Sequence, residues 1–243
     1  MATDFRWNKD SVLGIVGGMG PLASAEFLKT IYEHNPGKHE QVSAKVVMYS
    51  DPSFPDRTEA LLAGADAVVF EKLIDALQCL RRLNVSRIVI CCVTIHHLLP
   101  KLRVDLREPI WSLPDLIFRQ VSLSRERHLL LCSSGSRKLG LFQNHAQWQT
   151  LKDQFILPDE DDQALVHQMI YRLKGGYDPR RLICPLESLL AKYKTNSFIA
   201  GCTEIHLLAK HYETENGNRR EYGCVDPLTM IAKDLALAAK EDL

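Results

Sequence analysis

The sequence predicts an α/β protein of two pseudo-symmetric lobes, each a parallel sheet flanked by helices, with a cleft between the lobes. Three observations support this fold class. Apolar runs typical of strands alternate with longer segments typical of helices. Two of these runs, 12–16 and 87–92, are almost entirely apolar, as in strands that helices cover on both faces. Finally, the second half of the chain repeats features of the first.

Six strands are expected, each as a short apolar run between turn residues or polar segments. They cover residues 12–16, 44–49, 87–92, 128–132, 197–200 and 222–225. Helices are expected at 23–34, 59–83, 138–151, 160–173 and 179–193, in a short segment after Gly201-Cys202, and at 227–240, where Pro227 suits a first helical turn. Residues 50–57, with two prolines, are expected to form a loop. Because helices separate successive strands, the sheets are expected to be parallel.

The boundary between the lobes is expected at Leu113-Pro114. Residues 1–113 then form the first lobe and residues 114–209 the second. The closing helix is expected to return and pack on the first lobe, so about 210–243 is assigned to that lobe.

The composition argues against a nucleic-acid-binding protein and against a membrane-spanning protein. The chain has 243 residues, of which 46% are apolar and 25% charged, as in a globular protein with a sizeable core. The formal net charge is zero, so the chain lacks the basic excess typical of nucleic-acid binding. No run of eighteen apolar residues predicts a membrane-spanning helix, and residues 1–10 do not resemble a signal peptide. A soluble, cytoplasmic protein with no nucleic-acid or membrane partner is expected.

The seven cysteines are expected to be free thiols, since their number is odd and their spacing matches no disulfide framework. Cys91 and Cys92 lie close to His96 and His97, which raises the question of a metal site. Neighbouring strand residues point to opposite faces, however, and the usual zinc spacings are missing. No metal site is expected.

An internal repeat is the most informative pattern in the chain. Cys92 and Cys202 each end an apolar strand, and each is followed by isoleucine at +3 and histidine at +4. The turn at 17–20 after the first strand is matched by the turn at 133–136 after the strand at 128–132. Ligands bind outside the carboxyl ends of parallel strands, so both cysteines are expected at one cleft.

Two thiols that face each other across a cleft suit the movement of a proton from one face of a carbon to the other. A thiolate removes the proton, and a thiol returns one to the opposite face. Both cysteines precede expected helices, whose N-termini favour an anion. The alternative is that both cysteines only pack at strand ends. His96 and His206 either polarise a cysteine or pack, and the sequence leaves both options open.

Several other residues are candidate anion ligands. Residues 18–23 fit the dinucleotide fingerprint G-x-G-x-x-A, but the first acidic residue at a strand end, Asp51, follows too late in the chain. A glycine turn that holds a small carboxylate is the alternative interpretation. The turn at 133–136 suits the same task in the other lobe. Arg57, in a proline-bearing loop, suits a carboxylate or is a surface arginine, and Lys174 before Gly175 suits a helix C-terminus.

Five segments give the chain a resemblance to a known family over nearly its whole length. They are 14–21 (GIVGGMGP), 55–58 (PDRT), 92–96 (CVTIH), 174–175 (KG) and 201–205 (GCTEI). In these segments the chain resembles the aspartate/glutamate racemases that work without pyridoxal phosphate.

The resemblance implies two pseudo-symmetric lobes with the active site between them, a homodimer, no cofactor, and a small amino-acid or dicarboxylic-acid substrate. It implies that Cys92 and Cys202 are the acid/base pair, one on each face of the substrate α-carbon. It also implies a substrate pocket lined by Met19, Gly20, Arg57, Val93, Thr94, Ser133, Ser136, Lys174, Thr203 and Glu204. Arg57 and Lys174 would hold carboxylates, and the acidic side of the pocket would hold the ammonium.

Three departures from the family pattern bear on the substrate. Val93 stands where the family usually has asparagine, Leu139 where a small hydroxyl residue is common, and Ser133 and Ser136 where threonines are common. Loss of the amide is expected to remove one hydrogen bond to the ligand, which argues against assuming aspartate as the substrate. The alternatives are a related isomerase or decarboxylase of a small dicarboxylic acid and a binding protein that senses a small acid. A nucleotide-binding protein is a more distant alternative.

Overall fold

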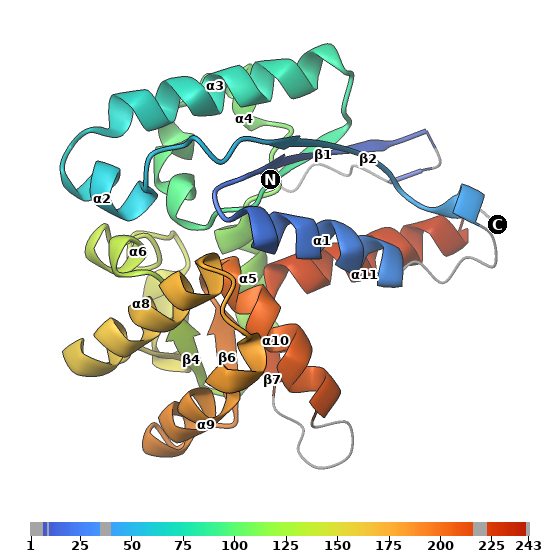
Figure 1. The fold of residues 1–243 in the computed structure, drawn as a ribbon. Coiled ribbons are helices and arrows are strands. Elements are labelled where there is room, and N and C mark those ends of the chain that lie inside the picture. The colour runs from blue at the N-terminus through green and yellow to red at the C-terminus, as the bar shows by residue number, and fades with distance from the viewer. Residues whose placement is uncertain (1–6, 9, 35–39, 216–222, 242–243) are drawn as a thin grey trace.

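The computed structural model describes residues 7–8, 10–34, 40–215 and 223–241 and contains two parallel sheets (Figure 1). The first sheet has the strand order β2–β1–β3, and the second has the order β5–β4–β6–β7. The strands are β1 (Val12–Gly17), β2 (Lys45–Ser50), β3 (Arg87–Ile90), β4 (His128–Leu131), β5 (Phe155–Ile156), β6 (Ser197–Ala200) and β7 (Gly223–Val225). All paired strands of both sheets are parallel, which confirms the predicted fold class. Tyr222, expected to open the last strand, lies outside the described residues.

Helices flank both sheets. Those of the first part of the chain are α1 (Pro21–His34), α2 (Arg57–Leu62), α3 (Asp66–Arg82), α4 (Val104–Arg107) and α5 (Leu113–Leu123). Those that follow are α6 (Ser134–Lys138), α7 (Trp148–Leu151), α8 (Glu160–Lys174), α9 (Ile183–Lys192), α10 (Glu204–Glu215) and α11 (Pro227–Glu241). Short 3-10 helices are η1 (Glu40–Val42), η2 (Thr94–Lys101), η3 (Lys152–Gln154) and η4 (Pro179–Leu182). Within the described ranges, every helix is too short or too polar to span a membrane.

Three helix predictions are wrong, each for a local reason. The single helix expected at 59–83 is two helices, because Gly64 adopts a φ of 70° between α2 and α3. The helix expected at 138–151 is absent over most of its length, because Gly140, at a φ of 64°, ends the short α6. The segment after Cys92 is the 3-10 helix η2, which contains Pro100 near its end.

Strand β5 and helix α5 are among the elements that the sequence prediction missed. Strand β5 has only two residues, too few for a periodic pattern. Helix α5 begins at the predicted lobe boundary, Leu113-Pro114, where Ser112 accepts a hydrogen bond from the backbone N–H of Asp115 (3.2 Å). A serine cap followed by proline in the first turn is a helix-start signal, so the sequence carried the information.

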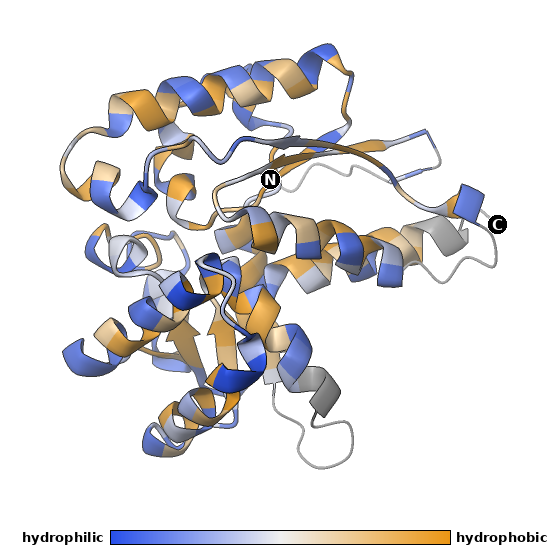
Figure 2. Ribbon diagram, in the orientation of Figure 1, coloured by the Kyte–Doolittle hydropathy of each residue, from blue (hydrophilic) through white to orange (hydrophobic). Residues whose placement is uncertain are grey.

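One apolar cluster is shared by both sheets. Leu13 and Ile15 of β1 belong to the same buried cluster as Leu130 of β4 and Ile199 of β6, together with side chains of α1, α5 and α11. Helix α11 packs along α1 (Figure 1). Figure 2 shows β4 and β6 in apolar colours, and the helices around them carry hydrophilic segments on their outer sides.

A buried polar link accompanies this packing. His206 of α10 is fully buried, and its Nδ1 lies 2.6 Å from Oδ2 of Asp226, which precedes α11. Its Nε2 lies 2.9 Å from Oγ1 of Thr30 on α1. Asp226 also accepts hydrogen bonds from the backbone N–H of Leu228 (3.1 Å) and the hydroxyl of Thr229 (2.7 Å). The link therefore joins α1, α10 and α11, and His206 is held by these contacts rather than by a cysteine.

Candidate active site

Cys92 and Cys202 follow the carboxyl ends of β3 and β6, one from each sheet. The backbone N–H of Cys92 donates to the carbonyl of Ile90 (2.7 Å), and that of Gly201 donates to the carbonyl of Ile199 (2.8 Å). Both cysteines are almost fully buried, with 6% and 5% of their surfaces exposed. An electrostatic interaction with Cys92 also acts on Cys202.

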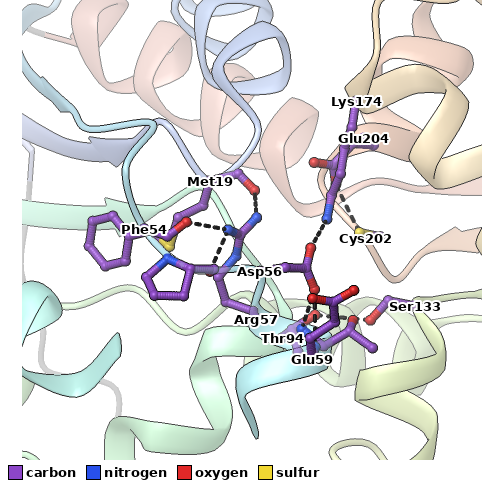
Figure 3. A network of polar contacts seen from close by, with 12 residues as sticks. Met19, Phe54, Asp56, Arg57, Glu59, Thr94, Ser133, Lys174, Cys202 and Glu204 are labelled. Carbon is purple, nitrogen blue, oxygen red and sulfur yellow. Dashed lines mark hydrogen bonds and ion pairs between the residues drawn. The ribbon is translucent and has the colours of Figure 1, made fainter. Parts of the chain in front are cut away.

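Arg57 is buried beside Cys92. The residue begins α2, and its guanidinium donates to the carbonyl oxygens of Met19, Pro55 (2.9 Å) and Phe54 (3.4 Å) (Figure 3). Burial acts to lower the pKa of Arg57, but Cys92 and the nearby carboxylates Asp56 and Glu204 raise it overall. Nε of this buried side chain has no partner. The three carbonyl contacts fix the guanidinium and leave one donor open to a ligand.

Glu204 lies beside the other sulfur. The thiol of Cys202 donates to Oε2 of Glu204 (2.9 Å), and the hydroxyl of Thr203 lies 3.4 Å from the same oxygen (Figure 3). Oε1 is buried without a partner and lies against Gly20, where a Cβ would be only 2.2 Å from this oxygen. Burial and then the negative charge of Glu204 raise the pKa of Cys202 well above its ordinary value. The turn after β1 and the start of α10 therefore meet at this carboxylate.

Lys174 and Asp56 form an ion pair between the end of α8 and the start of α2. Lys174 Nζ lies 3.3 Å from Asp56 Oδ2 and 4.2 Å from the centre of the Tyr171 ring. Asp56 caps α2 by accepting from the backbone N–H groups of Thr58 (2.8 Å) and Glu59 (3.1 Å). Burial acts to raise the pKa of Asp56, but Lys174, Tyr171 and the cap contacts together hold it at about 2. Burial likewise acts to lower the pKa of Lys174, and the negative charges around it raise it overall.

Three hydroxyl groups form a second buried cluster next to this network. Thr94 Oγ1 lies 3.0 Å from Ser133 Oγ and 2.9 Å from Ser136 Oγ, and the two serine hydroxyls are 3.1 Å apart. The turn that carries the serines packs tightly on α2, since a Cβ on Gly135 would lie 2.7 Å from Thr58 Oγ1. These hydroxyls are hydrogen-bond donors at the junction of the two sheets.

The predicted site residues fall into these two groups with one exception. The polar network contains Cys92, Cys202, Met19, Gly20, Arg57, Lys174, Thr203 and Glu204, and the hydroxyl cluster contains Thr94, Ser133 and Ser136. Val93 is different, because its side chain is fully buried in the apolar cluster shared by both sheets. Leu139, the second departure from the family pattern, packs against the apolar cluster of the first sheet.

The sequence interpretation did not include Asp56 and Tyr171. Asp56 carried a detectable signal, because Asp-x-x-Glu at 56–59 is a helix-capping pattern. Tyr171 reaches Asp56 from α8, a contact far apart in the chain that no local pattern indicates. Asp51, the acidic residue weighed against the dinucleotide fingerprint, bonds to Ser53 (2.8 Å) and Lys72 (3.1 Å).

His96 supports the backbone of Cys92. Its Nδ1 lies 2.9 Å from the Cys92 carbonyl oxygen, and its Nε2 accepts from the backbone N–H of Leu113 (3.2 Å). Burial lowers the pKa of His96 to about 4, so the ring is neutral at pH 7. A cavity of about 1010 Å³, lined by Trp7, Trp111 and His96 among others, lies beside this ring, and neither Cys92 nor Cys202 lines it.

The dual role of Asp56 gives a testable stability difference. Asp56→Asn keeps a good cap but removes the charge that faces Lys174, so the free energy of unfolding is expected to fall by about 1 kcal/mol or less. Asp56→Ala also removes the cap and is expected to cost about 1 kcal/mol more than Asp56→Asn. Urea unfolding of both variants measures the difference. Equal stability of the two variants would show that the cap contacts contribute nothing.

Comparisons with known proteins match this chain to one family and to solved structures of similar fold. A family model described as Asp/Glu/Hydantoin racemase matches residues 16–235. The structure resembles an aspartate racemase from Picrophilus torridus, with a TM-score of 0.78, 19% identity, and coverage of 95% of this chain and 94% of that chain. It also resembles an aspartate racemase homologue from Pyrococcus horikoshii OT3, with a TM-score of 0.64, 17% identity, and coverage of 95% and 99%. An allantoin racemase from Klebsiella pneumoniae matches with a TM-score of 0.50, 14% identity, and coverage of 96% and 89%. At these identities the structural likeness shows the two-lobed fold.

Proposed function

Because this chain belongs to the Asp/Glu/hydantoin racemase family, we propose that it is a cofactor-independent amino-acid racemase of the aspartate/glutamate type. Cys92 and Cys202 are the acid/base pair in this proposal. The observation that supports it best is a buried site with two thiols and two open polar atoms of opposite charge. The open atoms are Nε of Arg57 and Oε1 of Glu204. A zwitterion carries the two charges that complement them.

The reaction moves one proton off the substrate and another onto it. The thiolate of one cysteine removes the α-proton, and the electron pair of the broken C–H bond stays on the α-carbon and its carboxylate. The thiol of the other cysteine then protonates the opposite face, so the two sulfurs exchange protonation states in one turnover. Hydrogen-bond donors and cations around the carboxylate stabilise the carbanion-like intermediate. The roles of the two cysteines are reversed for the opposite enantiomer.

In this proposal each binding residue has a task. Arg57 and Lys174 hold carboxylate groups, with the hydroxyls of Thr94, Ser133 and Ser136 as further donors. Glu204 holds the ammonium group through Oε1. Met19 fixes Arg57 through its carbonyl group, and Gly20 and Thr203 contact Glu204.

Val93 bears on the identity of the substrate side chain. An apolar residue at this position removes the amide that the family usually offers, so aspartate is not the default substrate. The family resemblance further supports a homodimer, and a cytoplasmic location is part of the same proposal.

A protein with this fold has two alternative functions. One is an isomerase or decarboxylase of a small dicarboxylic acid, and the other is a protein that binds a small acid without turnover. The family description also includes hydantoins, which carry no ammonium group. The open oxygen of Glu204 favours an ammonium-bearing substrate over these ligands.

The test is α-proton exchange in deuterium oxide. The reduced protein is incubated with single L-amino acids, beginning with aspartate and glutamate, and then with a substituted hydantoin and small dicarboxylic acids. Proton NMR follows the α-proton signal, and chiral chromatography detects the D enantiomer. Loss of the signal together with formation of the D enantiomer supports the proposal. Exchange or racemisation only with the hydantoin, or none with any amino acid, contradicts it.

A further inference from the structure

The histidines that follow the two cysteines make different contacts, although the sequence repeat places both of them at +4. The ring nitrogens of His206 bond to α1 and to the residue just before α11. His96 contacts the cysteine of its own repeat, since its Nδ1 lies 2.9 Å from the Cys92 carbonyl oxygen. The carbonyl of Cys202 accepts from the backbone N–H of Ile205 (3.0 Å). A side chain therefore holds the carbonyl of Cys92, whereas a backbone group holds that of Cys202.

The hydrogen bonds of His96 determine which of its ring nitrogens carries the proton. The backbone N–H of Leu113 donates to Nε2 at 3.2 Å, so Nε2 is the unprotonated nitrogen. Burial lowers the pKa of His96 to about 4, so the ring is neutral at pH 7 and its one proton lies on Nδ1. Nδ1–H therefore donates to the carbonyl of Cys92. Two directed hydrogen bonds through one ring connect the backbone of Cys92 to the start of α5.

Two further contacts fix the backbone around Cys92. Its own N–H donates to the carbonyl of Ile90 at the end of β3 (2.7 Å). The carbonyl of the preceding residue, Cys91, accepts from the hydroxyl of Thr203 in the turn after β6 (3.2 Å). Helix α5, which the ring of His96 contacts, leads into β4 of the second sheet. The backbone at Cys92 is therefore held by groups connected to both sheets, and His96 supplies the contact on its carboxyl side.

We propose that His96 is a positioning residue that presents Cys92 to the substrate by holding the Cys92 carbonyl against the start of α5. This inference rests on the proposed function, in which the Cys92 sulfur exchanges a proton with the α-carbon. The ring itself takes no part in proton transfer, because Nδ1–H faces a carbonyl group and Nε2 faces a backbone N–H. A small displacement of an acid/base group lowers the rate of the chemical step and leaves most of the substrate binding in place.

Two substitutions separate the two hydrogen bonds of His96. The amide of asparagine reaches the place of Nδ1, so His96→Asn keeps a donor for the Cys92 carbonyl and loses the acceptor for Leu113. The amide of glutamine reaches the place of Nε2, so His96→Gln keeps the acceptor and loses the donor. Each variant loses one hydrogen bond, so both are expected to unfold at similar urea concentrations. With the best substrate, His96→Gln is expected to lower kcat by about 10- to 100-fold with little change in KM, and His96→Asn to retain most of the wild-type kcat.

The carbonyl of Cys92 can also be observed without turnover. Protein labelled with 13C at cysteine carbonyls and with 15N at valine gives one NMR correlation for each Cys-Val pair, at 92–93 and at 224–225. Val225→Ile removes the second correlation and so assigns both. Loss of the donor is expected to move the Cys92 carbonyl signal upfield in His96→Gln and not in His96→Asn. The Cys224 signal is the internal reference and is expected to stay in place.

Thr30→Val is the matched control, since it removes the hydroxyl that contacts Nε2 of His206 and leaves His96 intact. It is expected to lower stability without changing kcat or the Cys92 carbonyl signal. Equal kcat values, or equal Cys92 signals, in His96→Asn and His96→Gln would overturn the proposal. Should either variant fail to fold, 15N NMR of the wild-type histidine rings decides, since a proton on Nε2 of His96 would overturn it.

The two measurements distinguish this inference from the proposed function. A wild-type protein without racemase activity would contradict the proposed function, and the carbonyl signals would still show whether His96 holds Cys92. Racemase activity that His96→Asn and His96→Gln retain equally would overturn this inference alone.

Discussion

Replacing either Cys92 or Cys202 by serine is expected to lower racemisation by about 10²- to 10⁴-fold. Each sulfur serves one face of the α-carbon, so the loss of one interrupts the reaction for both enantiomers. A serine hydroxyl is a much weaker acid than a thiol and does not supply the base. The measurement is the rate of optical rotation change with the best substrate from the deuterium-exchange experiment, compared with the wild-type rate.

The control is Cys184→Ser, which alters an exposed cysteine on α9 and is expected to keep the wild-type rate. Circular dichroism of each variant checks that the fold is retained. The two active-site variants should be affected alike, because a racemase needs both faces. Retention of near wild-type racemisation by both single variants would exclude the two-thiol mechanism.

Asp226→Ala is expected to lower the free energy of unfolding by about 3–5 kcal/mol, because it removes a buried carboxylate and leaves Nδ1 of His206 without its partner. The substitution also removes the oxygen that accepts from the backbone N–H of Leu228 at the start of α11. For a protein of this size, such a loss lowers the Tm by roughly 6–20 °C. Calorimetry or thermal circular dichroism at pH 7 measures the change. Asp234→Ala on α11 is the matched control, since it breaks only an exposed ion pair with Arg119 of α5 and is expected to cost less than about 1 kcal/mol.

The effect of Asp226 is expected to depend on pH in a defined direction. Burial acts to raise the pKa of Asp226, but His206, Thr229 and the N–H of Leu228 together lower it. A carboxylate with a lowered pKa in the folded state contributes stability above its unfolded pKa, and this contribution is lost as the pH falls through the folded value. The stability difference between wild type and Asp226→Asn is therefore expected to persist at neutral pH and to shrink below the ordinary range of aspartate. A difference that instead grows on acidification would contradict this assignment.

Local patterns in the sequence were sufficient to predict the fold class and to select the two cysteines as candidates. Cys92 and Cys202 were detectable because each follows an apolar run and is itself followed by isoleucine at +3 and histidine at +4. The carboxyl ends of parallel strands then required that they lie near the cleft. The contact of Glu204 with Gly20 was not detectable, since it joins two turns that are far apart in the chain.

The errors also have local physical causes. Residues 138–151 contain enough helix-forming side chains to suggest one helix, but Gly140 adopts a positive φ that ends the first turn. The role of His96 could not be predicted, because its ring accepts a hydrogen bond from the backbone N–H of Leu113. Leu113 begins α5, a helix that the sequence interpretation did not include. Val93 shows a related limit. A family pattern indicates which residue is replaced, but only the packing shows that its side chain belongs to the apolar cluster.

The apolar cluster shared by the two sheets links their folding. One buried cluster contains Leu13 and Ile15 of the first sheet and Leu130 and Ile199 of the second. Separation of the two sheets would therefore expose apolar surface on both. Each lobe therefore derives part of its own stability from the other, and the loss of one sheet destabilises the second. The chain is therefore expected to unfold as one cooperative unit, which coincident unfolding transitions by two spectroscopic probes would show.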